Sequence, residues 1–150
     1  MENWMSVDEI LDFAISEEEN AVGFYTELAY MAGNRQMKDV FLEFADEERG
    51  HKARIQAVKD GKQFTASAKE ITDLKISDYV ADVSTDKIEN FEDALVVAMK
   101  KEKVAFKLYT RLAGMVNSKE AGDLFLALAQ EEAKHKLRFE VEYDQSLKEN

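Results

Sequence analysis

Glutamate and histidine occur three residues apart at two places in the sequence, as Glu48 with His51 and as Glu132 with His135. The chain contains no other histidine. Residues three apart lie on one face of an α-helix, so the carboxylate and the imidazole of each pair can reach the same metal ion. Apolar residues precede both pairs at helical spacing, which predicts that the two glutamates face inward, where an unpaired carboxylate is costly. A bound cation would remove that cost.

The two pairs belong to an internal duplication. When the sequence is shifted by 84 residues against itself, Leu11–Ile55 aligns with Leu95–Phe139, and 18 of the 45 aligned positions are identical. The alignment also separates neighbouring acids. Among the three consecutive glutamates at 17 to 19, only Glu18 aligns with another glutamate, Glu102, whereas its neighbours align with lysines. We therefore expect Glu18 and Glu102 to be the third and fourth carboxylates of the site.

Two aligned tyrosines, Tyr25 and Tyr109, follow Glu18 and Glu102 by seven residues, about two helical turns. This spacing predicts that their hydroxyls donate to the carboxylates and orient them; the alternative is a pair of core tyrosines bonded elsewhere. Two further acids, Glu47 and Glu131, directly precede the Glu-x-x-His pairs. They can hydrogen-bond nearby groups, but we expect them on a solvated face.

Composition indicates a single all-α domain over residues 1–150. The 150 residues are 45% hydrophobic and include six glycines and no proline, which favours long helices around a sizeable core. The net charge of −11 argues against binding to nucleic acid or to an anionic membrane surface. The absence of cysteine excludes a disulfide framework or a thiolate metal site in this sequence. No signal peptide or membrane-spanning run is apparent, so we expect a soluble, cytoplasmic protein.

The hydrophobic periodicity predicts an antiparallel four-helix bundle. The helices are expected at about 7–32, 35–60, 90–116 and 118–145, with a polar end after Tyr143 that frays. Short links join the first helix to the second and the third to the fourth, whereas a long crossover at about 61–89 runs to the far end of the bundle. A short amphipathic piece at 76–83 interrupts this crossover. Its Tyr79 is expected to pack, with a catalytic role as the alternative.

The helix lengths place the acids at one level. Glu18 and Glu48 each lie about 15 residues, or about 22 Å, from the first interhelical turn, and Glu102 and Glu132 are level with each other in the same way. Four carboxylates and two imidazoles in one layer match the pattern of dimetal carboxylate bundles. The four carboxylates balance two divalent cations, and oxygen-rich ligation with two imidazoles suits iron or manganese.

These residues resemble the diiron domain of rubrerythrins in the ferritin-like superfamily. The likeness extends over about residues 6–143 and is carried by the paired Glu and Tyr of the first and third helices and by Glu48-Arg49-Gly50-His51 and Glu132-Ala133-Lys134-His135. The resemblance implies a bundle with one long crossover and two iron ions, with manganese as the alternative. The implied ligands are Glu18, Glu48, His51, Glu102, Glu132 and His135.

The resemblance also implies reduction of hydrogen peroxide or dioxygen with electrons from a redox partner. Full-length rubrerythrins carry a cysteine-rich rubredoxin-like domain, which is missing here, so an external electron-donor protein is expected. Many rubrerythrins also have an extra glutamate about one turn after the ligand of the third helix, whereas Lys103-Val104-Ala105 offers none. Peroxidase chemistry is therefore less strongly indicated than metal binding.

Other functions fit the same residues. An iron-binding, ferroxidase-type protein would use the same ligands but would need a hollow multi-subunit shell for storage, whereas we expect a homodimer. A non-redox dimanganese or structural metal site is a third hypothesis. A bundle that merely buries ion pairs is the least favourable, because such pairs contribute little net stability.

Overall fold

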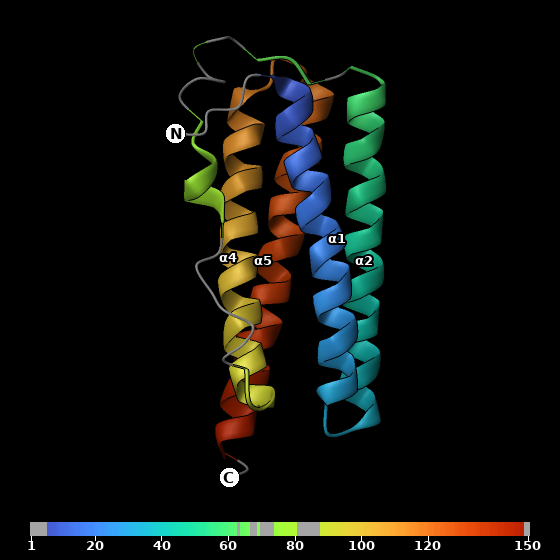
Figure 1. Ribbon diagram of the computed structural model, residues 1–150, viewed down its shortest axis with the longest axis vertical. Helices are drawn as coiled ribbons and strands as arrows, with labels where there is room; N and C mark the ends of the chain where they lie inside the picture. Colours follow the sequence, from blue (N-terminus) through green and yellow to red (C-terminus); the bar gives the residue numbers. More distant parts are fainter. Residues whose placement is uncertain (1–5, 63, 67–68, 70–73, 81–87, 149–150) are drawn as a thin grey trace.

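The computed structural model describes residues 6–62, 64–66, 69, 74–80 and 88–148. Four long helices form the bundle: α1 (Val7–Met31), α2 (Arg35–Asp60), α4 (Phe91–Met115) and α5 (Lys119–Lys148). A short 3-10 helix, η1 (Ile76–Tyr79), belongs to the crossover. The predicted all-α four-helix bundle is thereby confirmed (Figure 1).

Side-chain caps fix where the helices begin. Ser6 Oγ accepts a hydrogen bond from the Glu9 amide at 3.1 Å, and Asn34 and Asn90 cap α2 and α4 in the same way. Ser118 accepts from an amide in the first turn of α5. Each cap satisfies an amide that has no partner inside the helix. These residues explain why the predicted helix starts lie within about one residue of the observed ones.

The expected fraying after Tyr143 is wrong, because α5 continues to Lys148. The Arg138 and Glu142 side chains pair one turn apart at 3.0 Å along this last part of the helix. The Ser146 hydroxyl also donates to Glu92 of α4. The polar end of α5 is therefore held against the neighbouring helix.

The helices form two hairpins, α1 with α2 and α4 with α5, which lie side by side (Figure 1). Helix α2 ends at the top of this view and α4 begins at the bottom, so the chain crosses the full length of the bundle between them, as predicted. Helix α1 runs antiparallel to its neighbour α4, and α2 runs antiparallel to α5. Each of the four helices can therefore contribute side chains to a shared centre.

Two apolar clusters fill the bundle, one toward each end. The upper cluster includes Ile10 and Leu112, and the lower cluster includes Phe41 and Phe139. Between them lie all the buried charged or polar residues that the described chain contains. The site is thus sealed above and below by apolar side chains.

Among the described residues, no helix combines the length and apolar character needed to span a bilayer.

The crossover reaches the bundle through η1, which packs on α4 (Figure 1). Tyr79 is half-buried against the upper apolar cluster, which confirms the expected packing. Burial raises the pKa of its hydroxyl. The predicted amphipathic piece extended to residue 83, and its last three residues lie outside the described part of the chain.

We predict that Phe41→Ala lowers the free energy of unfolding by about 3–5 kcal/mol, as expected when a fully buried aromatic ring is removed. Phe41 is 0% exposed, and its ring lies 5.6 Å from that of Phe139 and 5.8 Å from that of Phe91. Urea unfolding of the metal-free protein measures the change. Leu126→Ala is the control, because Leu126 is 48% exposed and its truncation should cost much less. A loss below 1 kcal/mol for Phe41→Ala would contradict this packing.

Candidate metal centre

Six buried side chains form one layer at the middle of the bundle, and they are the six that the sequence predicts. Each is at most 2% exposed, although all are charged or polar. Helices α1 and α4 supply one glutamate each, and α2 and α5 supply a glutamate and a histidine each. This polar layer consists of Glu18, Glu48, His51, Glu102, Glu132 and His135.

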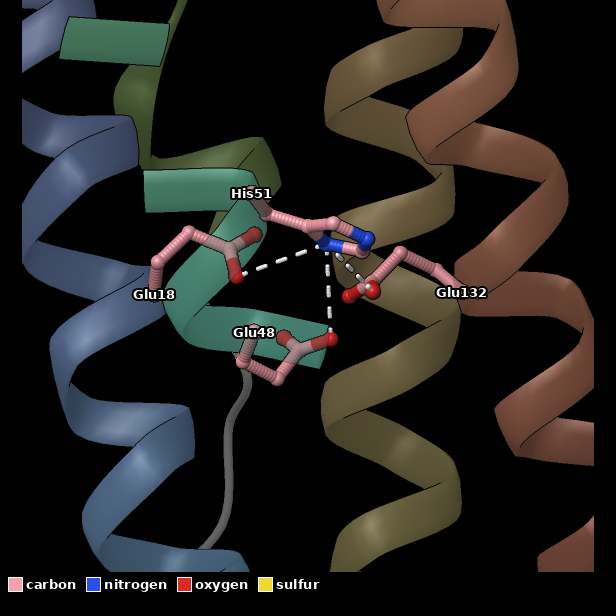
Figure 2. A group of neighbouring side chains, drawn as sticks. All are labelled: Glu18, Glu48, His51 and Glu132. Atoms are coloured by element: carbon pink, nitrogen blue, oxygen red, sulfur yellow. Dashed lines mark ion pairs between the residues drawn. The ribbon is translucent and has the colours of Figure 1, made fainter. Parts of the chain in front are cut away.

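The polar layer divides into two overlapping groups of four residues. In the first, His51 Nδ1 lies 3.6 Å from Glu18, 3.4 Å from Glu48 and 3.3 Å from Glu132 (Figure 2). One ligand atom from each of these four residues lies within 4.8 Å of every other. Such a cluster has the donor types and the compactness that one cation requires.

In the second group, His135 Nδ1 lies 3.3 Å from Glu48, 3.7 Å from Glu102 and 3.8 Å from Glu132. Glu48 and Glu132 belong to both groups, whereas each of the other four residues belongs to one. The two shared carboxylates can therefore bridge two cations. The two imidazole rings are nearly parallel, with centroids 6.5 Å apart, and each serves one group.

The donor atoms fit two metal ions because they lack other partners. Buried polar atoms normally have a hydrogen-bond partner. In the described chain, each of the six residues has a buried oxygen or nitrogen without one, and these atoms face one another. They are Glu18 Oε2, Glu48 Oε1, His51 Nδ1, Glu102 Oε2, Glu132 Oε1 and His135 Nδ1. Two divalent cations would satisfy all six and cancel the charge of four carboxylates.

Glu47 and Glu131 do not simply face solvent, which corrects the sequence-based expectation. The Nε2 of His135 donates to Glu47, and the Nε2 of His51 lies 3.3 Å from Glu131. In both cases the acid comes from the opposite hairpin, so only the assembled bundle reveals the contact. The hydrogen bond from His135 Nε2 to Glu47 holds the proton there and leaves Nδ1 free to bind a cation, whereas Glu131 approaches His51 Nε2 without forming a hydrogen bond.

The two acids are held differently. Arg54 contacts Glu131 at 3.3 Å and competes with His51 for its carboxylate. The aligned arginine, Arg138, instead pairs with Glu142, so Glu47 remains available to His135. The two repeats therefore have the same residue types at the candidate ligand positions, but the contacts around these positions differ.

Only one of the two predicted tyrosine contacts is present. The Tyr109 hydroxyl of α4 donates to Glu18 of α1 and so orients that carboxylate. The Tyr25 hydroxyl is buried and has no hydrogen-bond partner in the described part of the chain. Its ring lies edge-on to the His135 ring, with centroids 6.3 Å apart.

Burial and neighbouring charged groups shift the pKa values of the residues in the polar layer. Burial raises the pKa of Glu18 and of Glu132 well above the usual carboxyl value, and neighbouring carboxylates add to the effect. Burial likewise raises the pKa of Glu102. It acts in the same direction on Glu48, but the contacts with His135 and other neighbours outweigh it and lower that pKa to about 2. The nearby carboxylates outweigh the opposing effect of burial on His135 and raise its pKa to about 11.

Comparison with known proteins supports the fold. Among the solved structures that match this chain, two are each 24% identical to it. The first is a protein from Thermotoga maritima, whose structure is described as that of a ferritin-like diiron-carboxylate protein. It matches with a TM-score of 0.78 over 97% of this chain and 99% of its own. A hypothetical protein from Pyrococcus furiosus matches with a TM-score of 0.77 over 96% and 92%. A search of curated proteins finds no match.

The chain thus has the fold of a ferritin-like four-helix bundle, with a buried layer of carboxylates and imidazoles at its centre. The family model for rubrerythrin matches residues 9–143, which include all six residues of the layer. The chain belongs to the rubrerythrin family.

We predict that Glu132→Ala weakens the binding of both metal ions by roughly ten-fold or more, because its carboxylate belongs to both groups. Glu102→Ala should weaken chiefly one ion, because Glu102 belongs to one group. Anaerobic titration with ferrous iron against a chelator separates the two cases. Glu27→Ala, at an exposed position of α1, is the control. Unchanged binding of two ions by Glu132→Ala would contradict the bridging role.

We also predict that Glu47→Gln lowers iron affinity by roughly 10- to 100-fold, because an amide holds the His135 tautomer less firmly. Glu131→Gln should have a smaller effect, since Glu131 is shared with Arg54. The same chelator titration measures both variants. Glu43→Gln provides the control one turn earlier on α2, where the side chain is exposed. Equal affinities for all three variants would show that these contacts do not support the imidazoles.

Proposed function

We propose that this protein is a diiron oxidoreductase that reduces hydrogen peroxide, or dioxygen, with electrons from a separate electron-donor protein. The observation that carries the proposal is the set of six buried donor atoms that have no hydrogen-bond partner within the described residues and that form two overlapping groups. Membership of the rubrerythrin family supports iron as the metal. Carboxylates and imidazoles also suit manganese, which is the alternative metal.

The residues of the chain would hold the ions in a nearly neutral, water-poor site. Glu48 and Glu132, which belong to both groups, would be shared by the two ions, and Glu18 with His51 and Glu102 with His135 would complete the two groups. Apolar clusters above and below keep the local dielectric low. The four carboxylates cancel the charge of two ferrous ions, and the acids behind the imidazoles stabilise additional positive charge on oxidation.

The bound ions supply the redox chemistry. Two bound ferrous ions would supply the two electrons that, together with two protons, convert hydrogen peroxide into two molecules of water. The separate electron-donor protein would supply the two electrons needed for the next cycle. The 150 residues contain no cysteine that could hold a thiolate iron centre, which is why we propose a separate donor.

We expect about two irons per chain after anaerobic loading, and rapid oxidation of both by one equivalent of hydrogen peroxide. The absorbance of the ferric form, recorded by stopped flow, follows the reaction. Addition of a chemical reductant should restore the ferrous protein for a further cycle. The matched control is Glu132→Ala, which should lose both metal and peroxide reactivity.

A chain that binds two irons but reacts with neither peroxide nor dioxygen would contradict the proposed function. Iron storage makes a different prediction, since storage requires a closed shell of many subunits. Sizing the native particle separates the two possibilities: the homodimer that we expect leaves no room for an iron core.

A further inference from the structure

A cavity of about 160 Å³ lies between α1 and α4, on the carboxylate side of the polar layer. All four carboxylates of the layer line it, whereas neither histidine does. Tyr79 of the crossover lines the same cavity together with exposed Val80. A small molecule can therefore approach the metal positions through this cavity.

Small residues make room for this cavity. Ala21 and Ala105 occupy aligned positions in the duplication, one turn after Glu18 and Glu102, and both line the cavity. Longer side chains at these two positions would extend over the carboxylates. The available volume greatly exceeds that of a single water molecule, which takes about 30 Å³ in the liquid.

Tyr25 and Tyr109 both line the cavity, but they differ in the hydrogen bonding of their hydroxyls. Tyr109 donates to Glu18, whereas the hydroxyl of Tyr25 has no partner in the described residues. Tyr25 itself is 1% exposed. Leaving a buried hydroxyl unpaired is unfavourable. The rings of Phe44 and Phe139 pack against Tyr25 at centroid distances of 6.5 and 5.5 Å and restrict its ring.

We propose that the Tyr25 hydroxyl binds the small oxidant by donating a hydrogen bond to it in this cavity. The proposal rests on the proposed function and adds a ligand-binding residue to it. The ligand class is a molecule of two or three heavy atoms with an oxygen or nitrogen acceptor, such as hydrogen peroxide or azide. Tyr25 keeps its own proton, and the hydrogen bond stabilises negative charge as it grows on the acceptor atom. Tyr109 has a different role, because its hydroxyl already holds Glu18.

Azide binding to the iron-loaded, oxidised protein tests the proposal, with Tyr25→Phe and Tyr109→Phe as matched variants. Tyr25→Phe should retain two irons at parental affinity but bind azide about five- to ten-fold more weakly, the loss expected for one hydrogen bond. Tyr109→Phe should instead weaken iron binding, because Glu18 loses its donor. Absorbance titration measures azide binding, and chelator competition measures iron binding.

A second variant tests the cavity without altering Tyr25. Ala105→Leu should fill the space from the α4 side and weaken azide binding while both irons remain bound. Ala133→Leu, at an exposed position of α5, should leave azide binding unchanged. If Ala105→Leu binds azide as tightly as the parent, the cavity is not the ligand site and the proposal is overturned.

The outcomes distinguish this proposal from the proposed function. Equal azide affinity in Tyr25→Phe and the parent overturns the role of Tyr25, even if peroxide oxidises the iron normally. Loss of iron from Tyr25→Phe to the same extent as from Tyr109→Phe also overturns it, since Tyr25 would then only hold a carboxylate. Tyr25-dependent azide binding without any reaction with peroxide supports the ligand site but contradicts the proposed function. A parent protein that takes up no iron contradicts both.

Discussion

The bundle is built around a concentration of charge that its own residues do not neutralise. Four carboxylates and two imidazoles lie in one layer, each at most 2% exposed, between two apolar clusters. Burial raises the pKa values of three of the carboxyl groups, which favours their protonated forms when no cation is bound. Cations replace those protons at neutral pH. We therefore propose that metal binding is the interaction on which the structure and the function of this centre both depend.

The internal duplication explains how the layer forms. Two hairpins place equivalent side chains at the same height, and their association brings the two sets together (Figure 1). Glu48 and Glu132 meet at the centre because they occupy equivalent positions in the two repeats. The repeats differ in their contacts, because Tyr109 holds Glu18, whereas the Tyr25 hydroxyl has no hydrogen-bond partner among the described residues.

The sequence predicted the parts of the site that depend on local spacing. Glu-x-x-His in a helix and the alignment of Glu18 with Glu102 were sufficient to identify six residues that the structure brings together. Their role as metal ligands remains a prediction. The helix starts were predictable because Ser6, Asn34 and Asn90 are strong caps.

Contacts between the hairpins were not predictable in the same way. Glu47 and Glu131 have helical positions that suggest solvent, and only the packing of one hairpin on the other brings them to the histidines. The difference between the Tyr109 and Tyr25 contacts also depends on the relative placement of the helices, which local spacing does not define. The end of α5 was predicted too early because its polar sequence conceals the contact of Ser146 with α4.

Anomalous X-ray diffraction at the iron absorption edge, from crystals loaded anaerobically with ferrous iron, tests the central claim most directly. Two peaks of anomalous density should lie inside the polar layer, both within bonding distance of Glu48 and Glu132. One peak should be completed by Glu18 and His51, and the other by Glu102 and His135. A layer without anomalous density, with its carboxylates paired only to one another and to the imidazoles, would contradict the account.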